Sequence, residues 1–194
     1  MPGDEGKTGI QDLIDFWFAE SSKARWYDST AEFDQSCFDR FGKLVQLAKA
    51  GDLDQWAETP LGALALCLLL DQMPRNIYRA SPKAFESDQK AILVAKDAIE
   101  RGFDQELDLE KRKFLYLPFM HSEVLAEQER SVSIATTLGD EETVRHAIEH
   151  AEVIRRFGRF PHRNAILGRV STEEEIAYLE AGAETYGQSS RGEG

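Results

Sequence analysis

The sequence predicts an all-α fold of eight or nine helices. Apolar residues recur at three- and four-residue intervals along most of the chain, which is the periodicity of a helix face. Strand signals are nearly absent, because the chain has no Asn-Gly or Asp-Gly turn and no sustained alternation of β-branched residues. The predicted helices follow one another through short connections, which is typical of antiparallel helix pairs stacked on one another.

Two helices are predicted in the N-terminal part of the chain. The first covers about residues 10–18, and the second covers about residues 29–50, where Gly51 is the residue that follows a helix C-terminus. Residues 1–9 are polar and rich in glycine, so we expect them to form a mobile tail.

The most apolar helix is predicted at residues 61–71. Thr59 and Pro60 precede it as an N-cap and a first-turn proline. Because this helix is apolar on every side, we expect it in the middle of the core. Proline lacks the N–H group that continues a helix, so Pro74 is expected to end it, and the next helix covers about residues 87–101.

Further helices are predicted in the second half of the chain. Residues 110–138 form a helix that Pro118 kinks or restarts, and residues 141–157 form the next one. The last covers about residues 172–179, where the sequence fits a capping box. Residues 183–194 are polar and rich in Gly and Ser, so we expect a second mobile tail.

Length and charge limit the functions that the chain can have. Its 194 residues fit one compact domain, which we place at residues 10–182. The net charge of −12 argues against general binding of nucleic acids or anionic membranes, because phosphate groups need clustered Lys and Arg. The longest apolar run, residues 61–70, is about half as long as a membrane-spanning helix.

The cysteines and the N-terminus indicate the compartment. Cys37 and Cys67 belong to no CxxC pair and lie within apolar helical patterns, so we expect two buried free thiols. The N-terminus lacks the basic and apolar regions of a signal peptide. We therefore expect a cytoplasmic protein.

A cationic segment lies within this acidic chain. Residues 145–169 contain six arginines and only two acids, a local charge of +4, together with three of the four histidines. Guanidinium and imidazole groups in a concave site bind carboxylates or phosphates well, so the segment indicates an anion site. The alternative is that these arginines pair with acids of neighbouring helices.

Two other segments place polar side chains in apolar surroundings. Residues 71–76 follow the apolar helix, and polar groups there either find partners or cap the break at Pro74. After Pro118, His121 and Gln128 fall on the same helix face as apolar residues. They are either hydrogen-bonded core residues or groups that line a cavity.

One short motif has the spacing of a zinc site. His146, Glu149 and His150 match the HxxEH pattern of inverted zinc peptidases, in which both imidazoles face the same way. Such a pattern also arises by chance in a helix rich in Glu and His, and no obvious third ligand lies downstream. We therefore predict no metal site and no cofactor.

Several longer motifs are similar to those of a known family. They are FWF (16–18), WY (26–27), LLLDQMPRNIYR (68–79), FLYLPFMHSE (114–123), QERS (128–131) and RFGRFPHRN (156–164). Over about residues 10–179 the chain resembles the bacterial and fungal family called domain of unknown function 924. This resemblance implies a tetratricopeptide-like helical fold. It implies no activity, because the family is uncharacterised.

The resemblance also narrows the candidate site. The polar positions of the family correspond here to Asp71, Gln72, Arg75, Asn76, His121, Glu123, Gln128, Arg130, His150, Arg159, His162, Arg163 and Asn164. His146 and Glu149 do not correspond to family positions, which further weakens the zinc motif.

The preferred hypothesis is a binding site for a small anion. Arg75, Arg159 and Arg163 would hold a carboxylate or phosphate group in a pocket between helix pairs. Asn76 and Asn164 would fix its orientation.

Three alternatives use the same residues or the same fold. An enzyme would use His121 or His162 as acid or base, with Glu123 or Asp71 as the orienting carboxylate. A peptide-binding adaptor would present the concave groove of a tetratricopeptide-like stack to a protein partner. In the last, the polar residues around Asp71 and Arg163 form a buried ion-pair network that fixes the helix packing.

Overall fold

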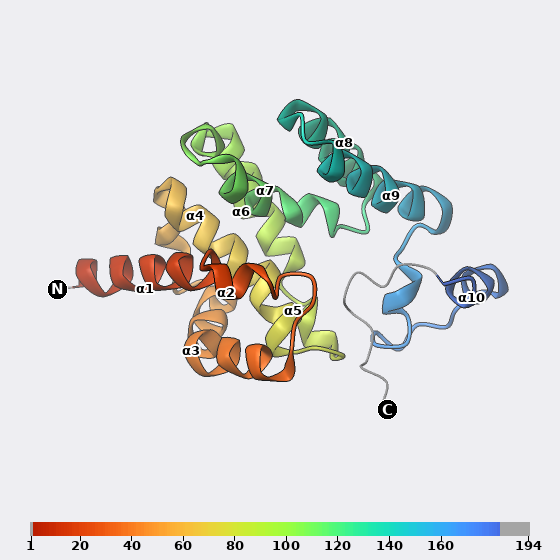
Figure 1. Ribbon diagram of the computed structural model, residues 1–194, viewed down its shortest axis with the longest axis horizontal. Helices are drawn as coiled ribbons and strands as arrows, with labels where there is room; N and C mark the ends of the chain where they lie inside the picture. The colour runs from red at the N-terminus through yellow and green to blue at the C-terminus, as the bar shows by residue number, and fades with distance from the viewer. Residues whose placement is uncertain (1, 183–194) are drawn as a thin grey trace.

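The computed structural model describes residues 2–182, and every regular element among them is helical (Figure 1). The α-helices are α1 (Pro2–Trp17), α2 (Glu20–Lys23), α3 (Ala31–Ala50), α4 (Pro60–Cys67), α5 (Met73–Ile77), α6 (Asp88–Glu100), α7 (Leu109–Met120), α8 (Leu125–Leu138), α9 (Glu141–Phe157) and α10 (Glu173–Glu180). A π-helical segment, η2 (Leu68–Gln72), joins α4 to α5, and 3₁₀ turns lie at η1 (Asp54–Glu58), η3 (Pro82–Ala84), η4 (Phe103–Glu106) and η5 (Pro161–Arg163). The all-α prediction is confirmed for these residues.

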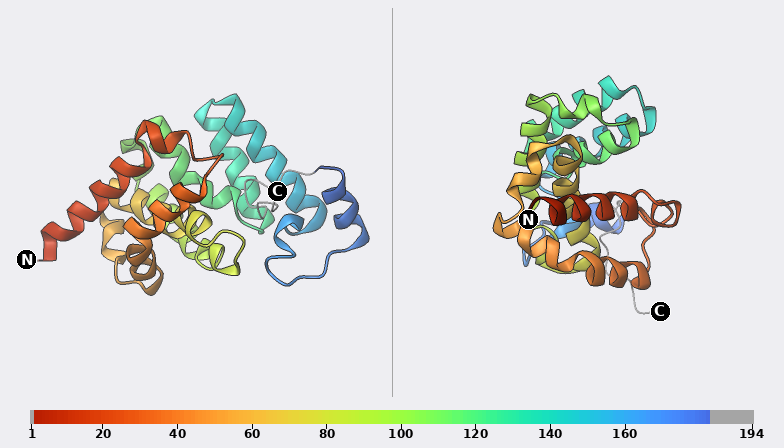
Figure 2. Two further views of the ribbon diagram at one scale, coloured as in Figure 1. Left: turned by 60° about the horizontal axis from the view of Figure 1, so that its bottom comes forward. Right: turned by 90° about the vertical axis from the view of Figure 1, so that its left-hand side faces the viewer.

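The core surrounds the rod that α4 and η2 form. Leu64, Leu66 and Leu69 of this rod are completely buried. Helices α1, α6 and α7 pack against α4, and α3 packs against η2 (Figure 2). Burying a leucine side chain contributes about 1.5–3 kcal/mol, so this rod supplies a large part of the folding free energy. The prediction of a helix buried on all sides is therefore confirmed.

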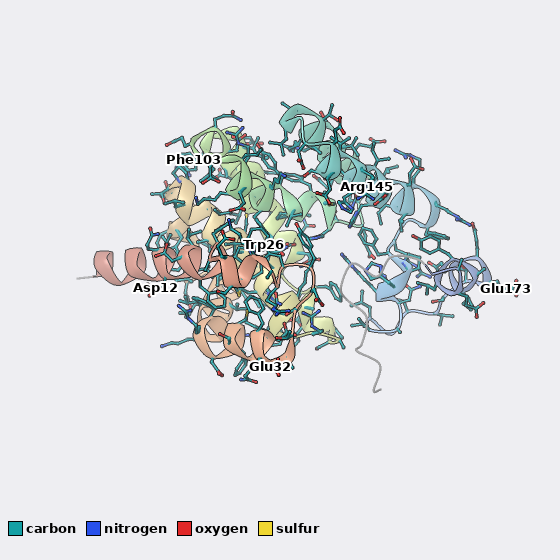
Figure 3. The ribbon with its side chains drawn as sticks, in the orientation of Figure 1. Asp12, Trp26, Glu32, Phe103, Arg145 and Glu173 are labelled. Atoms are coloured by element: carbon teal, nitrogen blue, oxygen red, sulfur yellow. The ribbon has the colours of Figure 1, made fainter. Side chains whose placement is uncertain are left out.

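An aromatic cluster joins α1 to α7 beside this rod. Trp17 is buried, stacks on Trp26 at a ring-centroid distance of 6.3 Å and meets Phe114 edge-on at 5.7 Å. Figure 3 labels Trp26. Trp26 also donates its indole N–H to the backbone carbonyl of Trp17. These contacts fix the end of α1 and the loop that follows it against the core.

The sequence predicted that the apolar helix ends at Pro74, but in the structure the rod continues through this residue. It continues as the π-helical segment Leu68–Gln72 and then as α5. Pro74 has no N–H to donate to the carbonyl of Leu70, and the Ser87 hydroxyl donates to that carbonyl instead, at 2.6 Å. A hydrogen bond from the next helix therefore replaces the one that proline removes, so the rod extends for one more turn.

The helix around Pro118 also differs from the prediction. Helix α7 runs through Pro118 to Met120, and the break comes later, at residues 121–124, before α8 begins. Gln128 explains the position of the break. Its side-chain amide donates to the carbonyls of Met120 and Ser122, at 2.7 and 2.6 Å. These bonds satisfy carbonyls that a helix end leaves without partners.

The helix ends that the sequence predicted most clearly are present. Gly51 follows α3 with a φ of 95°, a left-handed conformation that favours glycine. The Thr59 hydroxyl accepts the N–H of Gly62 at the start of α4. Thr172 and Glu175 form the predicted capping box of α10.

The two predicted tails have different outcomes. Helix α1 begins at Pro2, so the expected tail at residues 1–9 is helical from residue 2. Proline is accepted in the first turn of a helix, and α1 has a surface to pack on there, because a Cβ at Gly9 would lie 3.3 Å from the Trp56 ring. The second tail, residues 183–194, lies outside the described residues.

The last part of the chain extends away from the core. Helices α8 and α9 pack against each other, and η5 and α10 follow at the end opposite to α1 (Figure 1). Both cysteines, Cys37 and Cys67, are buried free thiols, as predicted. Among the described helices, none combines the length and the apolarity that crossing a bilayer requires.

The bond between Ser87 and Leu70 leads to a stability prediction. Replacing Ser87 by Ala removes the hydroxyl that donates to the buried Leu70 carbonyl, which costs about 1–3 kcal/mol. We expect the free energy of unfolding, measured by urea denaturation, to fall by that amount. Ser133→Ala, at an exposed serine of α8, provides the control and should change it by no more than about 0.5 kcal/mol. An equal effect of the two substitutions would contradict the role given to Ser87.

Candidate functional site

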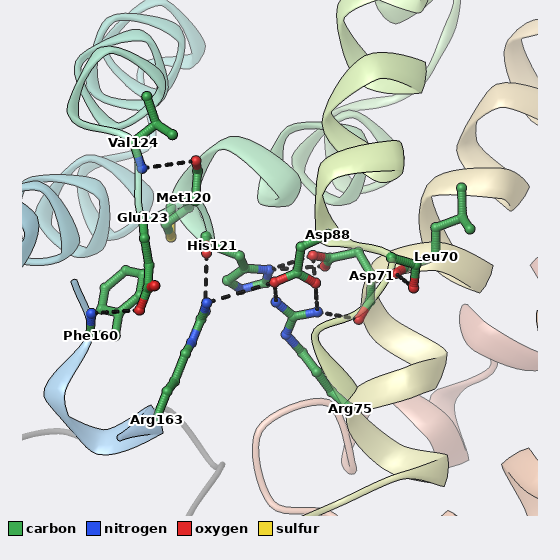
Figure 4. Close-up of polar contacts among 12 residues, drawn as sticks. Leu70, Asp71, Arg75, Asp88, Met120, His121, Glu123, Val124, Phe160 and Arg163 are labelled. Carbon is green, nitrogen blue, oxygen red and sulfur yellow. Dashed lines mark hydrogen bonds and ion pairs between the residues drawn. The ribbon is translucent and has the colours of Figure 1, made fainter. Parts of the chain in front are cut away.

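Five polar side chains meet where α5, the start of α6, the end of α7 and η5 come together (Figure 4). This central cluster consists of Asp71, Arg75, Asp88, His121 and Arg163. Segment η2 supplies Asp71, and α5, which continues the rod, supplies Arg75 one turn later, so the two side chains face the same side. The sequence predicted four of the five and missed Asp88.

Asp71 holds His121 in place. Its carboxylate is 1% exposed, and Nδ1 of His121 lies 2.9 Å from each of its two oxygens. Gln72 donates its amide to the same carboxylate at 2.5 Å. Although burial opposes ionisation, the charge of Arg75 and the hydrogen bond from His121 hold the pKa of Asp71 well below its usual range. Asp71 is therefore ionised, and His121 must donate its Nδ1–H to it.

Arg75 is the best-paired cation of the central cluster. Two of its nitrogens donate to the two carboxylate oxygens of Asp88, each at 3.0 Å, and one lies 3.1 Å from Asp71. The same guanidinium also donates to the backbone carbonyl of Asp71. This two-pronged geometry is the strongest form of an ion pair between arginine and a carboxylate.

Arg163 is held much less tightly. It is 6% exposed, and its nearest carboxylate oxygen, on Asp88, is 3.7 Å away. One nitrogen donates to the backbone carbonyl of His121 at 3.0 Å, while Nε is buried with no hydrogen-bond partner among the described residues. The guanidinium lies over the rings of Phe85 and Phe160, at 4.7 and 4.5 Å. Burial, together with the charge of Arg75, lowers the pKa of Arg163 to about 10.

A second cluster ties η5 and α10 to the loop between α7 and α8. Glu123 accepts two bonds from Arg169, at 2.7 and 3.0 Å, and a third from the backbone N–H of Phe160. Arg159 makes a two-pronged pair with the buried Glu175, at 2.6 and 2.8 Å. These contacts assign Glu123 and Arg159 to the packing of the C-terminal segment.

Asn164 belongs to the same second cluster. Its amide donates to the Ser171 hydroxyl and to Glu175, and its carbonyl oxygen accepts from Arg169. All its polar atoms therefore have protein partners.

A third cluster lies at the start of α3. The amide of Asn76 donates to Ser29 at 3.1 Å and to Asp34 at 2.8 Å, and Arg79 pairs with the same Asp34. Asn76 therefore faces away from Asp71 and Arg75 of the central cluster and joins α5 to α3. The sequence predicted it as a neighbour of the arginines, and the structure separates them.

Three other predicted residues, Gln128, Arg130 and His162, lie outside the central cluster and contact the chain around it. Gln128 joins α8 to the end of α7, as described above, and its side-chain oxygen is buried with no partner among the described residues. The Arg130 guanidinium lies 5.0 Å from the centroid of the Phe119 ring. His162 lies in η5, with its ring 5.5 Å from that of Phe160.

The zinc-like motif does not form a metal site in the structure. His146 is 42% exposed and lies beside Glu142 and Glu149, whereas His150 is buried and donates its Nδ1–H to the backbone carbonyl of His146. No group of three metal-ligating residues occurs in the part of the chain that the structure describes. The His150 ring instead lies 6.5 Å from that of His121, beside the central cluster.

Three residues that complete these clusters are not among the site residues predicted from the sequence. Asp88 lies in the helix predicted at residues 87–101, Arg169 in the cationic segment, and Glu175 in the helix predicted at residues 172–179. Their charged partners are between 13 and 75 positions away along the chain. The one available signal was the excess of arginines in residues 145–169, which requires acids from other elements.

Two hollows in the surface lie away from the central cluster. One, of about 410 Å³, is lined by Gly139, Val144 and Ile148, and the other, of about 630 Å³, lies along the first turns of α3. Neither borders Arg163.

Burial of His150 leads to a pH prediction. Burial, together with nearby His121, lowers its pKa to about 3, so between pH 6 and 4 the unfolded chain binds a proton that the folded chain does not. His150 therefore lowers stability as the pH falls through this range, by about 1.4 kcal/mol per pH unit. We expect His150→Asn to make the fall of unfolding free energy with decreasing pH less steep by that amount.

The exposed His146 on the same helix provides the control for this experiment, which uses urea denaturation at several pH values. The His146→Asn variant should follow the pH dependence of the unchanged protein. Parallel curves for His150→Asn and the unchanged protein would contradict the prediction.

Comparison with known proteins places the chain in a family. The model of the family described as "Bacterial protein of unknown function (DUF924)" matches residues 13–183. A solved structure of a protein of unknown function from Agrobacterium tumefaciens is 42% identical and superposes with a TM-score of 0.86, over 90% of this chain and 98% of that one. No curated protein matches the chain. Because the match covers most of the sequence, the chain belongs to the DUF924 family of bacterial proteins of unknown function.

Proposed function

We propose that the protein binds a small anion, a carboxylate or a phosphate, at Arg163. The observation behind this proposal is a buried guanidinium that lacks a full set of hydrogen-bond partners in the protein. Its nearest carboxylate oxygen is 3.7 Å away, and its Nε has no hydrogen-bond partner among the described residues. A buried charge without a full set of partners is costly, so such a group in a folded protein calls for a functional explanation.

The other two arginines of the sequence hypothesis are already paired within the protein. Arg75 has Asp88 and Asp71 as partners, and Arg159 has Glu175. An anion would have to displace a carboxylate of the chain to reach either of them. At Arg163 an anion would not have to displace a paired carboxylate. Of the three arginines that the sequence suggested, we therefore retain only Arg163 as the anion-binding residue.

The surroundings of Arg163 favour a small ligand. Phe85 and Phe160 cover the guanidinium, and neither surface hollow borders it. A group the size of a carboxylate or phosphate fits such a position better than a large organic molecule does. The charges of Asp71 and Asp88 balance those of Arg75 and Arg163, so a bound anion makes the central cluster negative and gains most from direct contact with Arg163.

The adaptor alternative has weaker support. A peptide-binding groove needs exposed Asn, Lys and Arg side chains, whereas Arg75, Asn76 and Asn164 are buried and bonded to the chain's own acids. The tetratricopeptide-like arrangement and the cytoplasmic location remain part of the proposal. The two free thiols are consistent with a reducing compartment.

Titration calorimetry with inorganic phosphate and with acetate tests the proposal. We expect Arg163→Gln to weaken the binding of either anion by about 10- to 100-fold, because a hydrogen bond to a charged group contributes about 1.5–3 kcal/mol. Arg163→Lys keeps the charge but loses the planar guanidinium, so its affinity for either anion should lie between those of the unchanged protein and Arg163→Gln. It also provides a second variant if Arg163→Gln does not fold.

Arg145→Gln is the matched control, because it removes one positive charge from an exposed position of α9. It should bind anions as the unchanged protein does. Failure of the unchanged protein to bind either anion at millimolar concentrations would overturn the proposal. Equal binding by the unchanged protein and Arg163→Gln would do so as well.

A further inference from the structure

His121 lies next to the proposed anion site and adds a second kind of group to it. Arg163 donates to the backbone carbonyl of His121 at 3.0 Å, so the guanidinium and this residue are direct neighbours (Figure 4). Arginine offers only donors to a ligand. The chemistry of the imidazole therefore decides what else the site recognises, provided that an anion binds at Arg163.

The hydrogen bond to Asp71 fixes the tautomer of His121. Both oxygens of that carboxylate lie 2.9 Å from Nδ1, and an ionised carboxylate only accepts, so Nδ1 carries a hydrogen. In a neutral imidazole the other nitrogen, Nε2, is then an acceptor.

The groups around His121 come from five elements. Asp71 of η2 and Asp88 of α6 are negative, Arg75 of α5 and Arg163 of η5 are positive, and His150 of α9 lies across from the ring. The two acids and the two arginines balance in charge. Burial therefore outweighs the attraction of Asp71 and lowers the pKa of His121 below its ordinary value, so the ring is neutral at pH 7.

The other nitrogen of this ring, Nε2, has no hydrogen-bond partner among the described residues. The side chain of His121 remains 16% exposed. The central cluster thus offers a ligand one cationic donor, Arg163, and one neutral acceptor, Nε2 of His121.

We propose that the ligand of this site is an oxyanion that also carries a hydroxyl hydrogen. Hydrogen phosphate and 2-hydroxy carboxylates share this chemistry. An anionic oxygen would bind Arg163, while the hydroxyl would donate to Nε2 of His121. Sulfate at neutral pH and simple carboxylates have no such hydrogen, so they would place a lone pair against the lone pair of Nε2.

Two matched ligand pairs test this selectivity on the full chain at pH 7. Glycolate and acetate have the same charge and differ in the hydroxyl, and phosphate and sulfate differ in the bound hydrogen. We expect glycolate to bind at least about tenfold more tightly than acetate, and phosphate more tightly than sulfate, by titration calorimetry. The two pairs also show whether a carboxylate or a phosphate is preferred.

Substituting His121 assigns the selectivity to the imidazole. His121→Phe keeps a planar ring but has no acceptor, so the difference between glycolate and acetate should disappear. His146→Phe, at an exposed histidine, should preserve it. If His121→Phe does not fold, ¹⁵N NMR of the imidazole in the unchanged protein replaces it: glycolate should shift the Nε2 resonance, and acetate should not.

The outcomes separate this inference from the proposed function. Equal binding of glycolate and acetate, with both lost in Arg163→Gln, would overturn the hydroxyl selectivity and leave the anion site standing. Absence of binding by all four anions would overturn both. Selectivity that persists in His121→Phe would show that another group reads the hydroxyl, and would overturn the role of His121.

Discussion

The buried carboxylate of Asp71 is the constraint on which the rest of the structure depends. Removing an ion from water costs several kcal/mol, and Asp71 lies in the helical rod at the centre of the core. Its partners come from the next turn of the rod, through Arg75, and from the end of α7, through His121. Arg75 in turn fixes the start of α6 through Asp88. One charge thus specifies how the end of α7 and the start of α6 are placed against the rod.

The charged side chains of the central cluster are not equally well supplied with hydrogen-bond partners. Asp71 and Arg75 have several partners each, whereas Arg163, at the outer end, has one hydrogen bond and a carboxylate at 3.7 Å. A network that served packing alone would gain by completing its last member, as the second cluster does for Arg159 and Glu175. This difference between the two clusters is the reason that we propose a ligand at Arg163 and not at Arg159.

Sequence reasoning succeeded where the determining contacts are local. Gly51, Thr59 and the capping box at Thr172 act within one turn, so the chain predicts them directly. It failed at Pro74 and at the break after α7, because Ser87 and Gln128 supply the missing hydrogen bonds from 17 and up to 8 residues away. The candidate site follows the same rule. Motifs identified most of its residues, but their pairing requires the fold, so Asp88 could not be recognised as a partner of Arg75.

The π-helical segment sets the direction of the site by chain length rather than by residue type. A π turn holds one residue more than an α turn, and each residue of an α-helix advances the next by about 100° around the axis. Shortening the stretch between Cys67 and Pro74 by one residue would restore a regular helix and rotate Asp71 and Arg75 relative to the apolar residues before them. A one-residue length difference here would therefore change which neighbouring helices Asp71 and Arg75 face, even if both residues were kept.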